Sequence, residues 1–438
     1  MSETLPKSDL SSRLSTVAVA LRRPTSWVLL GLGFSAALPF LLVGGTLGFW
    51  LRSSGISLTM IGYLSWITLF YGLKIVWAPW MDKVRLPLLY RLLGQRRSYM
   101  LLAQVGLSIG LTAMALIGPK HLWPFIVATL FVTFCAASQE IAVDAWRVEQ
   151  TNSDTDQALN PSFYSFGFKT GIVLSQSLVL ILSARAGWPL TYVIMAALIG
   201  IGMATTCLAQ RSEIEIDARP AATSIKGLLF DPFVSFWAEH KGTAGLILLT
   251  LAFYRLPDYL IGPVVGPMYQ DSGLDQAAIG AMRGTIGLTA AYAGVFIGGS
   301  CLLIFGLQRA FFLGALVGPL SNLCFSWLSV AKGSLLIFGF TLVMDDLGDG
   351  IAETAFVAFL TRMTGRDHTL THYALMYSVA ALTGKLLKGF SGAIVDGLTP
   401  LCGPFGAYQV FFFGTAIMAL PCMILCWCLR QKGVFSTR

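Results

Sequence analysis

The sequence has 438 residues, of which 55% are hydrophobic and only 12% are charged, and its formal net charge is +8. Soluble domains carry about 25% charged residues, so this composition leaves too few charges to cover several soluble domains. Apolar runs of about 20 residues, each long enough to cross a ~30 Å hydrocarbon core, recur along the whole chain. These totals exclude a soluble protein and indicate a membrane protein with many spans.

The basic excess does not indicate a nucleic-acid-binding protein, because the lysines and arginines lie mostly in the short segments between apolar runs. We therefore expect the lipid bilayer, and no nucleic acid, as a partner. Cys422, Cys426 and Cys428 have no His or acidic neighbour, so no metal site is expected. The sequence contains no Walker loop and no Ser/His/Asp or Cys/His constellation, so we expect no ATP, no cofactor and no enzyme activity.

The apolar runs predict twelve helical spans, because continuous runs are typical of membrane helices rather than of the alternating strands of a membrane barrel. The first run follows a polar, basic tail and has no evident cleavage site, so we expect it to be retained as a span. The spans are expected near residues 27–51, 60–80, 99–118, 124–146, 162–183, 189–210, 243–264, 278–304, 310–330, 334–360, 373–396 and 408–428.

The longest polar interruption divides these spans into two sets of six. This layout predicts an all-α polytopic membrane protein with the major facilitator fold, in which two six-helix bundles flank a central site. A short surface helix is expected within 225–237. The expected domains are a cytoplasmic tail (1–26), an N-terminal bundle (27–210), a cytoplasmic central loop (211–242), a C-terminal bundle (243–428) and a cytoplasmic tail (429–438).

The distribution of basic residues predicts the orientation in the membrane. Of the 30 Lys and Arg residues, 20 lie in segments that share one side, four lie on the opposite side and six lie within spans. Because basic loops remain in the cytoplasm, we expect both termini there, in a multi-pass membrane protein. We expect the chain to be a monomer.

Several charged residues lie inside the predicted spans. An ionisable residue at bilayer depth costs at least about 2.5–3.5 kcal/mol, so it normally faces water or a partner. Glu140 and Asp144 are four residues apart and share a helical face, and Asp345, Asp349 and Glu353 form one longer stripe. These charged residues include Lys74, Glu140, Asp144, Lys169, Arg255, Asp258, Asp345, Asp346, Asp349, Glu353, Lys385 and Lys388.

Two interpretations of these charges remain open. They line a polar cavity in which cations hold an anionic substrate and carboxylates carry a proton, or they form internal salt bridges that clamp helices together. On the first interpretation, proton coupling is expected at Glu140, Asp144, Asp345 and Asp349. The residues expected to bind substrate are then Lys74, Lys169, Arg255, Asp258 and Lys385.

Residues 136–147, with the sequence AASQEIAVDAWR, resemble the fourth-span signature of the AmpG-type muropeptide permeases, a group of major facilitators with a pattern close to A-S-Q-D/E-I-x-x-D-A-W. Four further segments are similar to this family. Residues 74–82 resemble the end of its second span, and residues 94–98 resemble its G-R-R-R loop, with Gln95 in place of a basic residue. Residues 256–258 resemble its seventh-span L-x-D, and residues 354–360 resemble the end of its tenth span. The resemblance covers nearly the whole membrane region.

The resemblance implies import of anhydro-muropeptides, which are cell-wall fragments built on N-acetylglucosaminyl-anhydro-N-acetylmuramic acid, from periplasm to cytoplasm. The proton-motive force would drive this symport, which serves peptidoglycan recycling and has an indirect part in β-lactamase induction. The partners would then be a small glycopeptide and protons. The resemblance also implies coupling by the two carboxylates of the signature, substrate contact by Gln139, and a cytoplasmic gate formed by Asp82 with Arg96 and Arg97.

Other functions remain open beside this one. The same fold could carry siderophores or acyl-CoA, and Asp349 and Glu353, which depart from the family pattern, bear on the cargo. A non-transporting membrane assembly factor is a third alternative. The charges within spans argue against it, because a scaffold needs no charged residues at the membrane midplane.

Overall fold

The computed structural model describes residues 23–150, 154–211, 234, 236–240, 242–331, 333–363 and 369–435. Most of the N-terminal tail and of the central loop, with the surface helix expected there, lies outside the described residues. The described residues form helices and no strand.

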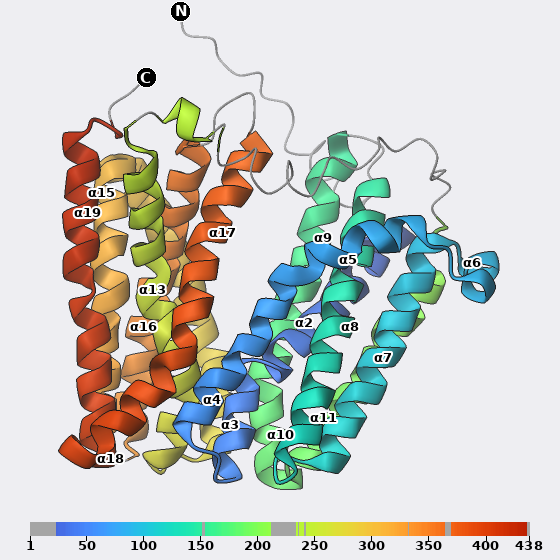
Figure 1. The fold of residues 1–438 in the computed structure, drawn as a ribbon, viewed down its shortest axis with the longest axis horizontal. Coiled ribbons are helices and arrows are strands. Elements are labelled where there is room, and N and C mark those ends of the chain that lie inside the picture. Colours follow the sequence, from blue (N-terminus) through green and yellow to red (C-terminus); the bar gives the residue numbers. More distant parts are fainter. Residues whose placement is uncertain are drawn as a thin grey trace, which may run out of the picture. The chain divides into compact units, whose positions relative to one another are not determined.

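The helices follow one another through short connections (Figure 1). Four of the elements are single turns of another helical type, 3-10 in η1 and η5 and π in η2 and η4. The elements are α2 (Pro24–Leu42), α3 (Gly45–Ser53), α4 (Leu58–Leu64), η1 (Ser65–Leu69), α5 (Phe70–Lys83), α6 (Pro87–Leu93), α7 (Gln95–Ile117), α8 (Leu122–Glu149), α9 (Asp154–Val173), η2 (Leu174–Leu178), α10 (Val179–Ala186), α11 (Trp188–Leu208), α13 (Ala244–Asp271), α14 (Gln276–Met282), η4 (Arg283–Gly287), α15 (Leu288–Val330), α16 (Leu335–Met363), α17 (Thr369–Leu387), η5 (Lys388–Phe390), α18 (Ser391–Ile417) and α19 (Ala419–Gln431).

Among the described residues, eight helical stretches are long and apolar enough to cross a membrane. Two of them have 55 and 57 residues, which at 1.5 Å per residue is about 80 Å, more than twice the hydrocarbon core. Each is interrupted by a glycine at positive φ, Gly306 (75°) or Gly403 (73°), so each holds two spans. Every span expected from the sequence falls on one of these helices or on α4–α5 or α16. The all-α membrane fold is confirmed.

Large apolar side chains cover much of the helix surface. Leu303 is 90% exposed and Leu116 81% exposed, which would be costly in water. In a membrane these side chains contact lipid, so the surface pattern agrees with a multi-pass membrane protein.

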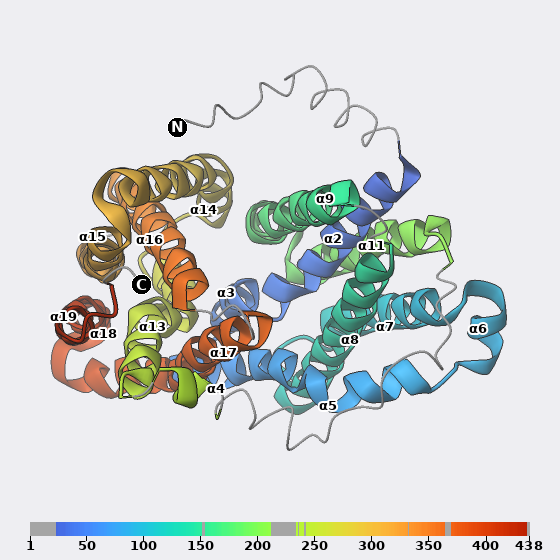
Figure 2. The ribbon, with the colours of Figure 1, turned by 90° about the horizontal axis from the view of Figure 1, so that it is seen from above.

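The contacts group the chain into two compact units. Unit 1 comprises residues 1–43, 70–175 and 189–219. Within it α2 and α9 lie side by side (Figures 1 and 2), and they approach so closely that a Cβ at Gly167 would clash with the carbonyl oxygen of Leu30. The core of this unit is built around Leu29, Leu32, Met100, Val143 and Trp146.

Unit 2 comprises residues 44–69, 176–188 and 220–438. Its core is formed mainly by α13, α15, α16, α17 and α19 and includes the buried rings of Phe311, Phe356 and Phe359. Within this unit α3, α4 and α10, which precede the central loop in sequence, pack against α13, α18 and α14, which follow it. The division into domains at residues 211–242 stays a prediction.

Candidate functional site

Arg255, on α13, is surrounded by acidic side chains of unit 2. Its Nη1 lies 2.7 Å from Asp349 Oδ1 and 3.1 Å from Asp258 Oδ2, and its Nη2 lies 3.0 Å from Glu353 Oε2. Asp349 and Glu353 are four residues apart on one face of α16, and Asp258 lies one turn along α13 from the arginine. Helical periodicity on two packed helices therefore brings the three carboxylates to one guanidinium. We call these four residues the Arg255 cluster.

The Arg255 cluster carries more acidic than basic groups. When all three carboxylates are ionised, one guanidinium leaves the cluster with an excess of negative charge. The Arg255 side chain is 19% exposed, whereas that of Asp349 is 53% exposed, so the cation is enclosed while one carboxylate reaches open space. This arrangement suits a group that takes up a proton or contacts a cationic part of a substrate.

Asp345 and Asp346 lie one turn before the Arg255 cluster on α16. The Oδ1 of Asp345 accepts a hydrogen bond of 3.2 Å from Ser321 Oγ on α15. The predicted stripe of Asp345, Asp349 and Glu353 is therefore divided, because its first member contacts α15 and the other two contact Arg255 on α13. No set of three or more His, Cys, Asp and Glu side chains in the described part of the chain is placed to hold a metal ion.

Arg283 links two π-helical turns within unit 2. It lies at the start of η4, and Gln176 lies in η2. With the amide oriented so that its oxygen faces the arginine, Gln176 Oε1 accepts hydrogen bonds from Arg283 Nη2 and, at 2.7 Å, from Nε. Isolated π turns within helices are frequent at functional sites, and this contact was not indicated by the sequence.

Two carboxylates of the fourth predicted span in unit 1 each lie beside a cation. Lys74 Nζ, on α5, lies 2.9 Å from Glu140 Oε1 on α8, and the two side chains are 33% and 34% exposed. Asp144 Oδ1 lies 3.1 Å from Arg147 Nη2, one turn along the same helix. Both carboxylates of the fourth-span signature thus have a cationic neighbour.

The other expected substrate residues lie in different surroundings. Gln139 is fully buried and its Nε2 donates a hydrogen bond of 3.0 Å to Ser35 Oγ, so in this conformation it packs α8 against α2. Lys169 is exposed on α9, and Lys385 is half-buried on α17. Lys388 Nζ donates a hydrogen bond of 2.8 Å to Thr68 Oγ1.

The residues of the expected gate have contacts that the sequence did not indicate. Arg96 Nε lies 2.9 Å from Glu149 Oε1, and both side chains are almost fully buried. Arg97 donates to the carbonyl oxygens of Thr206 (3.0 Å) and Cys207 (2.6 Å), near the end of α11. Asp82 lies on α5, and its side chain is outside those that the structure describes. The gate stays a prediction.

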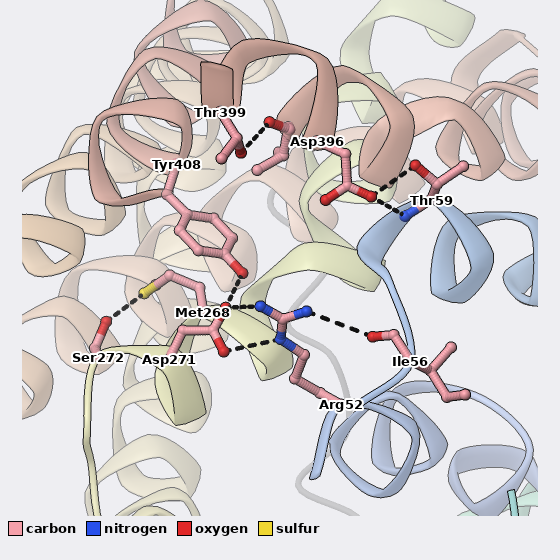
Figure 3. A network of polar contacts seen from close by, with 10 residues as sticks. Arg52, Ile56, Thr59, Met268, Asp271, Ser272, Asp396, Thr399 and Tyr408 are labelled. Carbon is pink, nitrogen blue, oxygen red and sulfur yellow. Dashed lines mark hydrogen bonds and ion pairs between the residues drawn. The ribbon is translucent and has the colours of Figure 1, made fainter. Parts of the chain in front are cut away.

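A polar network in unit 2 joins helices that are far apart in the sequence (Figure 3). Arg52 on α3 contacts Asp271 at the end of α13 through two parallel hydrogen bonds, Nε to Oδ1 (2.8 Å) and Nη2 to Oδ2 (2.6 Å). Tyr408 of α18 donates to the same carboxylate at 2.6 Å. Nearby, Asp396 Oδ2 accepts from the backbone N–H (2.8 Å) and hydroxyl (2.7 Å) of Thr59 at the start of α4.

Sequence reasoning did not assign a role to this network. Arg52 and Asp271 lie 219 residues apart, near the ends of predicted spans, where charges are common. One signal was available: Arg52 is one of only four basic residues expected on the non-cytoplasmic side. A basic residue on the side where few basic residues are expected is a candidate for a specific contact.

The fold defines the class of protein. The structure of a mutant of the nucleoside transporter NupG superposes with a TM-score of 0.69 at 15% sequence identity, covering 92% of this chain and 99% of that one. At this identity the similarity concerns the fold alone. The chain is a multi-pass membrane protein with the major facilitator fold.

Sequence comparison narrows this class. The model of the BT1 family matches residues 54–241. The putative transporter AmpG 4 of Rickettsia conorii is 26% identical over 408 residues, covering 92% of this chain and 95% of that protein. The anhydromuropeptide permease of Escherichia coli K12 is 28% identical over 413 residues, covering 94% and 80%. The chain is thus similar to AmpG-type permeases over nearly its whole length, which confirms the resemblance that the fourth-span motif indicated.

Proposed function

We propose that this chain is a proton-driven symporter that imports anhydro-muropeptides across the bacterial inner membrane. The observation that carries the proposal is the similarity to the E. coli anhydromuropeptide permease over 94% of the chain. In the proposal both termini lie in the cytoplasm, because 20 of the 30 basic residues are on their side of the predicted spans. The chain acts as a monomeric carrier and not as an enzyme.

The arrangement of charges supports separate roles for cations and carboxylates. Lys74, Lys169 and Lys385 are at least partly exposed and suit the anionic groups of a glycopeptide. Asp349 is the carboxylate that the contacts favour as the proton carrier, because it is the most exposed member of the Arg255 cluster and shares its cation. Glu140 lies beside a cation of its own, so its charge is already balanced.

The energetics fit this assignment. One proton that moves through 100 mV supplies about 2.3 kcal/mol, and a tenfold concentration ratio of a neutral solute requires about 1.4 kcal/mol. A single proton per cycle therefore supports more than tenfold accumulation of a neutral cargo. An anion that moves inward against the membrane potential returns part of that energy.

The network of Arg52, Asp271 and Tyr408 also has a place in the proposal. It ties a helix of the first half of the sequence to two helices of the second half by charge-assisted hydrogen bonds, which are the stronger kind. Alternating access requires the two halves to move against each other. We expect these bonds to hold the non-cytoplasmic helix ends together in this conformation and to break during transport.

Uptake into proteoliposomes tests the cargo. Purified protein is reconstituted, and radiolabelled anhydro-muropeptide, ferric siderophore and acyl-CoA are offered in parallel with an inward proton gradient. We expect accumulation of the anhydro-muropeptide only, with competition by the unlabelled compound. Accumulation of only the siderophore or only the acyl-CoA would support a carrier but contradict the proposed substrate. Failure of all three to enter, with correctly inserted protein, would favour the assembly factor.

A further inference from the structure

A cavity of about 790 Å³ opens at one end of unit 2, and none of the Arg255 cluster residues lines it. Its walls come from the turn within α15 at Gly306, from the last turns of α16 and α19, and from the residues that follow α19. The lining residues are Phe305, Gly306, Leu307, Gln308, Arg309, Phe312, Arg362, Arg430 and Phe435. Figures 1 and 2 show α15 and α19 side by side in this part of the unit.

The cavity is strongly basic. Three of its lining residues, Arg309, Arg362 and Arg430, carry guanidinium groups, and none of the lining residues that the structure describes is acidic. Arg362 and Arg430 lie in the last turns of α16 and α19, where a cation is favourable because helix carbonyl groups point outward. Arg309 differs, because it lies in the first turn after the break at Gly306. A cation is unfavourable at that end of a helix, so the helix dipole does not explain this residue.

The cavity is fixed in place by the core of the unit. The ring of Phe435 packs against those of Phe311 and Phe359, with centroid separations of 6.0 and 5.6 Å, and both partner rings are fully buried. The carbonyl oxygen of Phe435 accepts a hydrogen bond of 3.4 Å from Arg362 Nη2. Packing therefore holds the wall formed by Phe435 in place before any ligand arrives, which lowers the cost of binding.

We propose that this cavity binds the phosphate headgroup of an anionic phospholipid. Guanidinium groups bind phosphate oxygens through paired hydrogen bonds, and basic pockets between membrane helices on the cytoplasmic side suit anionic headgroups. The three arginines lie at span ends on the side that the basic residues assign to the cytoplasm, at the level of the headgroups. Three cations match a headgroup with two phosphates better than a headgroup with one.

The apolar surface beside the cavity supports a lipid over a free phosphate ion. Leu303, Ile304 and Phe305 precede the Gly306 turn and are 90%, 73% and 50% exposed. They form the end of the span next to the cavity. The acyl chains of a lipid held at the arginines would cover this surface, whereas an inorganic ion would leave it bare.

Native mass spectrometry of the full-length protein in detergent tests the proposal without any transport assay, so its failure is separate from a failure of the proposed cargo. The protein is titrated with cardiolipin, phosphatidylglycerol and phosphatidylethanolamine. We expect cardiolipin to bind most tightly and phosphatidylethanolamine most weakly. Arg309→Gln and Arg430→Gln should each weaken cardiolipin about tenfold, which corresponds to about 1.4 kcal/mol.

Matched variants separate a specific site from general charge attraction. Arg91→Gln removes one exposed arginine of unit 1 and should leave cardiolipin binding unchanged, while Arg309→Lys should retain part of it. Equal losses in Arg91→Gln and Arg309→Gln would overturn the site. Equal binding of phosphatidylethanolamine, or displacement of cardiolipin by ~10 mM inorganic phosphate, would overturn the assignment to an anionic lipid. A melting temperature measured for each variant shows that it is folded.

Discussion

The Arg255 cluster of unit 2 and the Lys74–Glu140 pair of unit 1 satisfy buried charge in different ways. In the pair one carboxylate meets one ammonium at 2.9 Å, and both side chains are about one-third exposed. In the cluster three carboxylates meet one guanidinium that is 19% exposed. Both sets contain residues that the sequence marks equally, as charges inside predicted spans.

This difference separates a structural contact from a group suited to proton exchange. In the Lys74–Glu140 pair the two charges cancel. Protonation of Glu140 or deprotonation of Lys74 would leave the other charge without its partner inside the span. The cluster has three acidic groups for one basic group, so one carboxylate can gain or lose a proton while the guanidinium keeps other partners. We therefore propose that coupling resides in unit 2 rather than in unit 1.

Arg255→Met should have the largest effect. It leaves the carboxylates of Asp258, Asp349 and Glu353 close together without their shared cation, so they repel one another. We expect little folded protein, measured by size-exclusion chromatography and thermal unfolding in detergent. Adding Asp258→Asn, Asp349→Asn and Glu353→Gln to the same chain should restore folding but not coupled uptake. An Arg255→Met protein as stable as the parent would contradict the charge argument.

Asp349→Asn should reduce gradient-driven accumulation of cargo at least tenfold. Folding and the equilibrium exchange of labelled cargo should stay intact. The amide has nearly the shape of the carboxylate but carries no exchangeable acidic proton. Asp144→Asn is the matched variant in unit 1. If that change removes coupling while Asp349→Asn does not, the proton path belongs to the fourth span and the comparison fails.

Arg52→Gln should have an intermediate effect that is confined to the helix ends around Arg52 and Asp271. It removes the paired hydrogen bonds to Asp271, so α3 and α4 should open more often. Hydrogen–deuterium exchange over residues 56–60 is expected to quicken several-fold. The matched control is Arg185→Gln, which changes an exposed arginine in the last turn of α10 and should leave that exchange unchanged. An unaltered exchange rate in Arg52→Gln would show that the network does not restrain these helices.

The smallest effect is expected at the Lys74–Glu140 pair. Because both side chains are partly exposed, loss of one should cost about 1 kcal/mol, seen as a small fall in the thermal midpoint. The double change Lys74→Glu with Glu140→Lys should restore the midpoint. Exchanging Arg255 and Asp258 should not, since two further carboxylates remain beside that position. If both exchanges restored the thermal midpoint, the Lys74–Glu140 pair and the Arg255 cluster would stabilise the fold in the same way.

The fold was accessible from the sequence because its signal is repeated. Apolar runs of about 20 residues allow one local structure in a membrane, and every expected span falls on a helix. The fourth-span motif also indicated the right relatives. Both inferences depend on contiguous residues, which a single sequence displays directly.

The pairing of charges was not accessible in the same way. That Asp349 and Glu353 contact Arg255 while Asp345 contacts Ser321 depends on how α13, α15 and α16 pack and rotate. Helical spacing placed the three acids on one face but did not name their partners. The contact of Arg52 with Asp271 spans 219 residues, and nothing local to either residue predicts it.

Proton movement into proteoliposomes, followed with an internal pH-sensitive dye as cargo is added, tests the central claim most directly. The account predicts that anhydro-muropeptide triggers acidification with the parent protein. It predicts no acidification with Asp349→Asn, although that variant still exchanges labelled cargo. Cargo-dependent acidification of equal rate in Asp349→Asn would contradict the assignment of the proton to the Arg255 cluster, and uptake by the parent without any acidification would contradict symport itself.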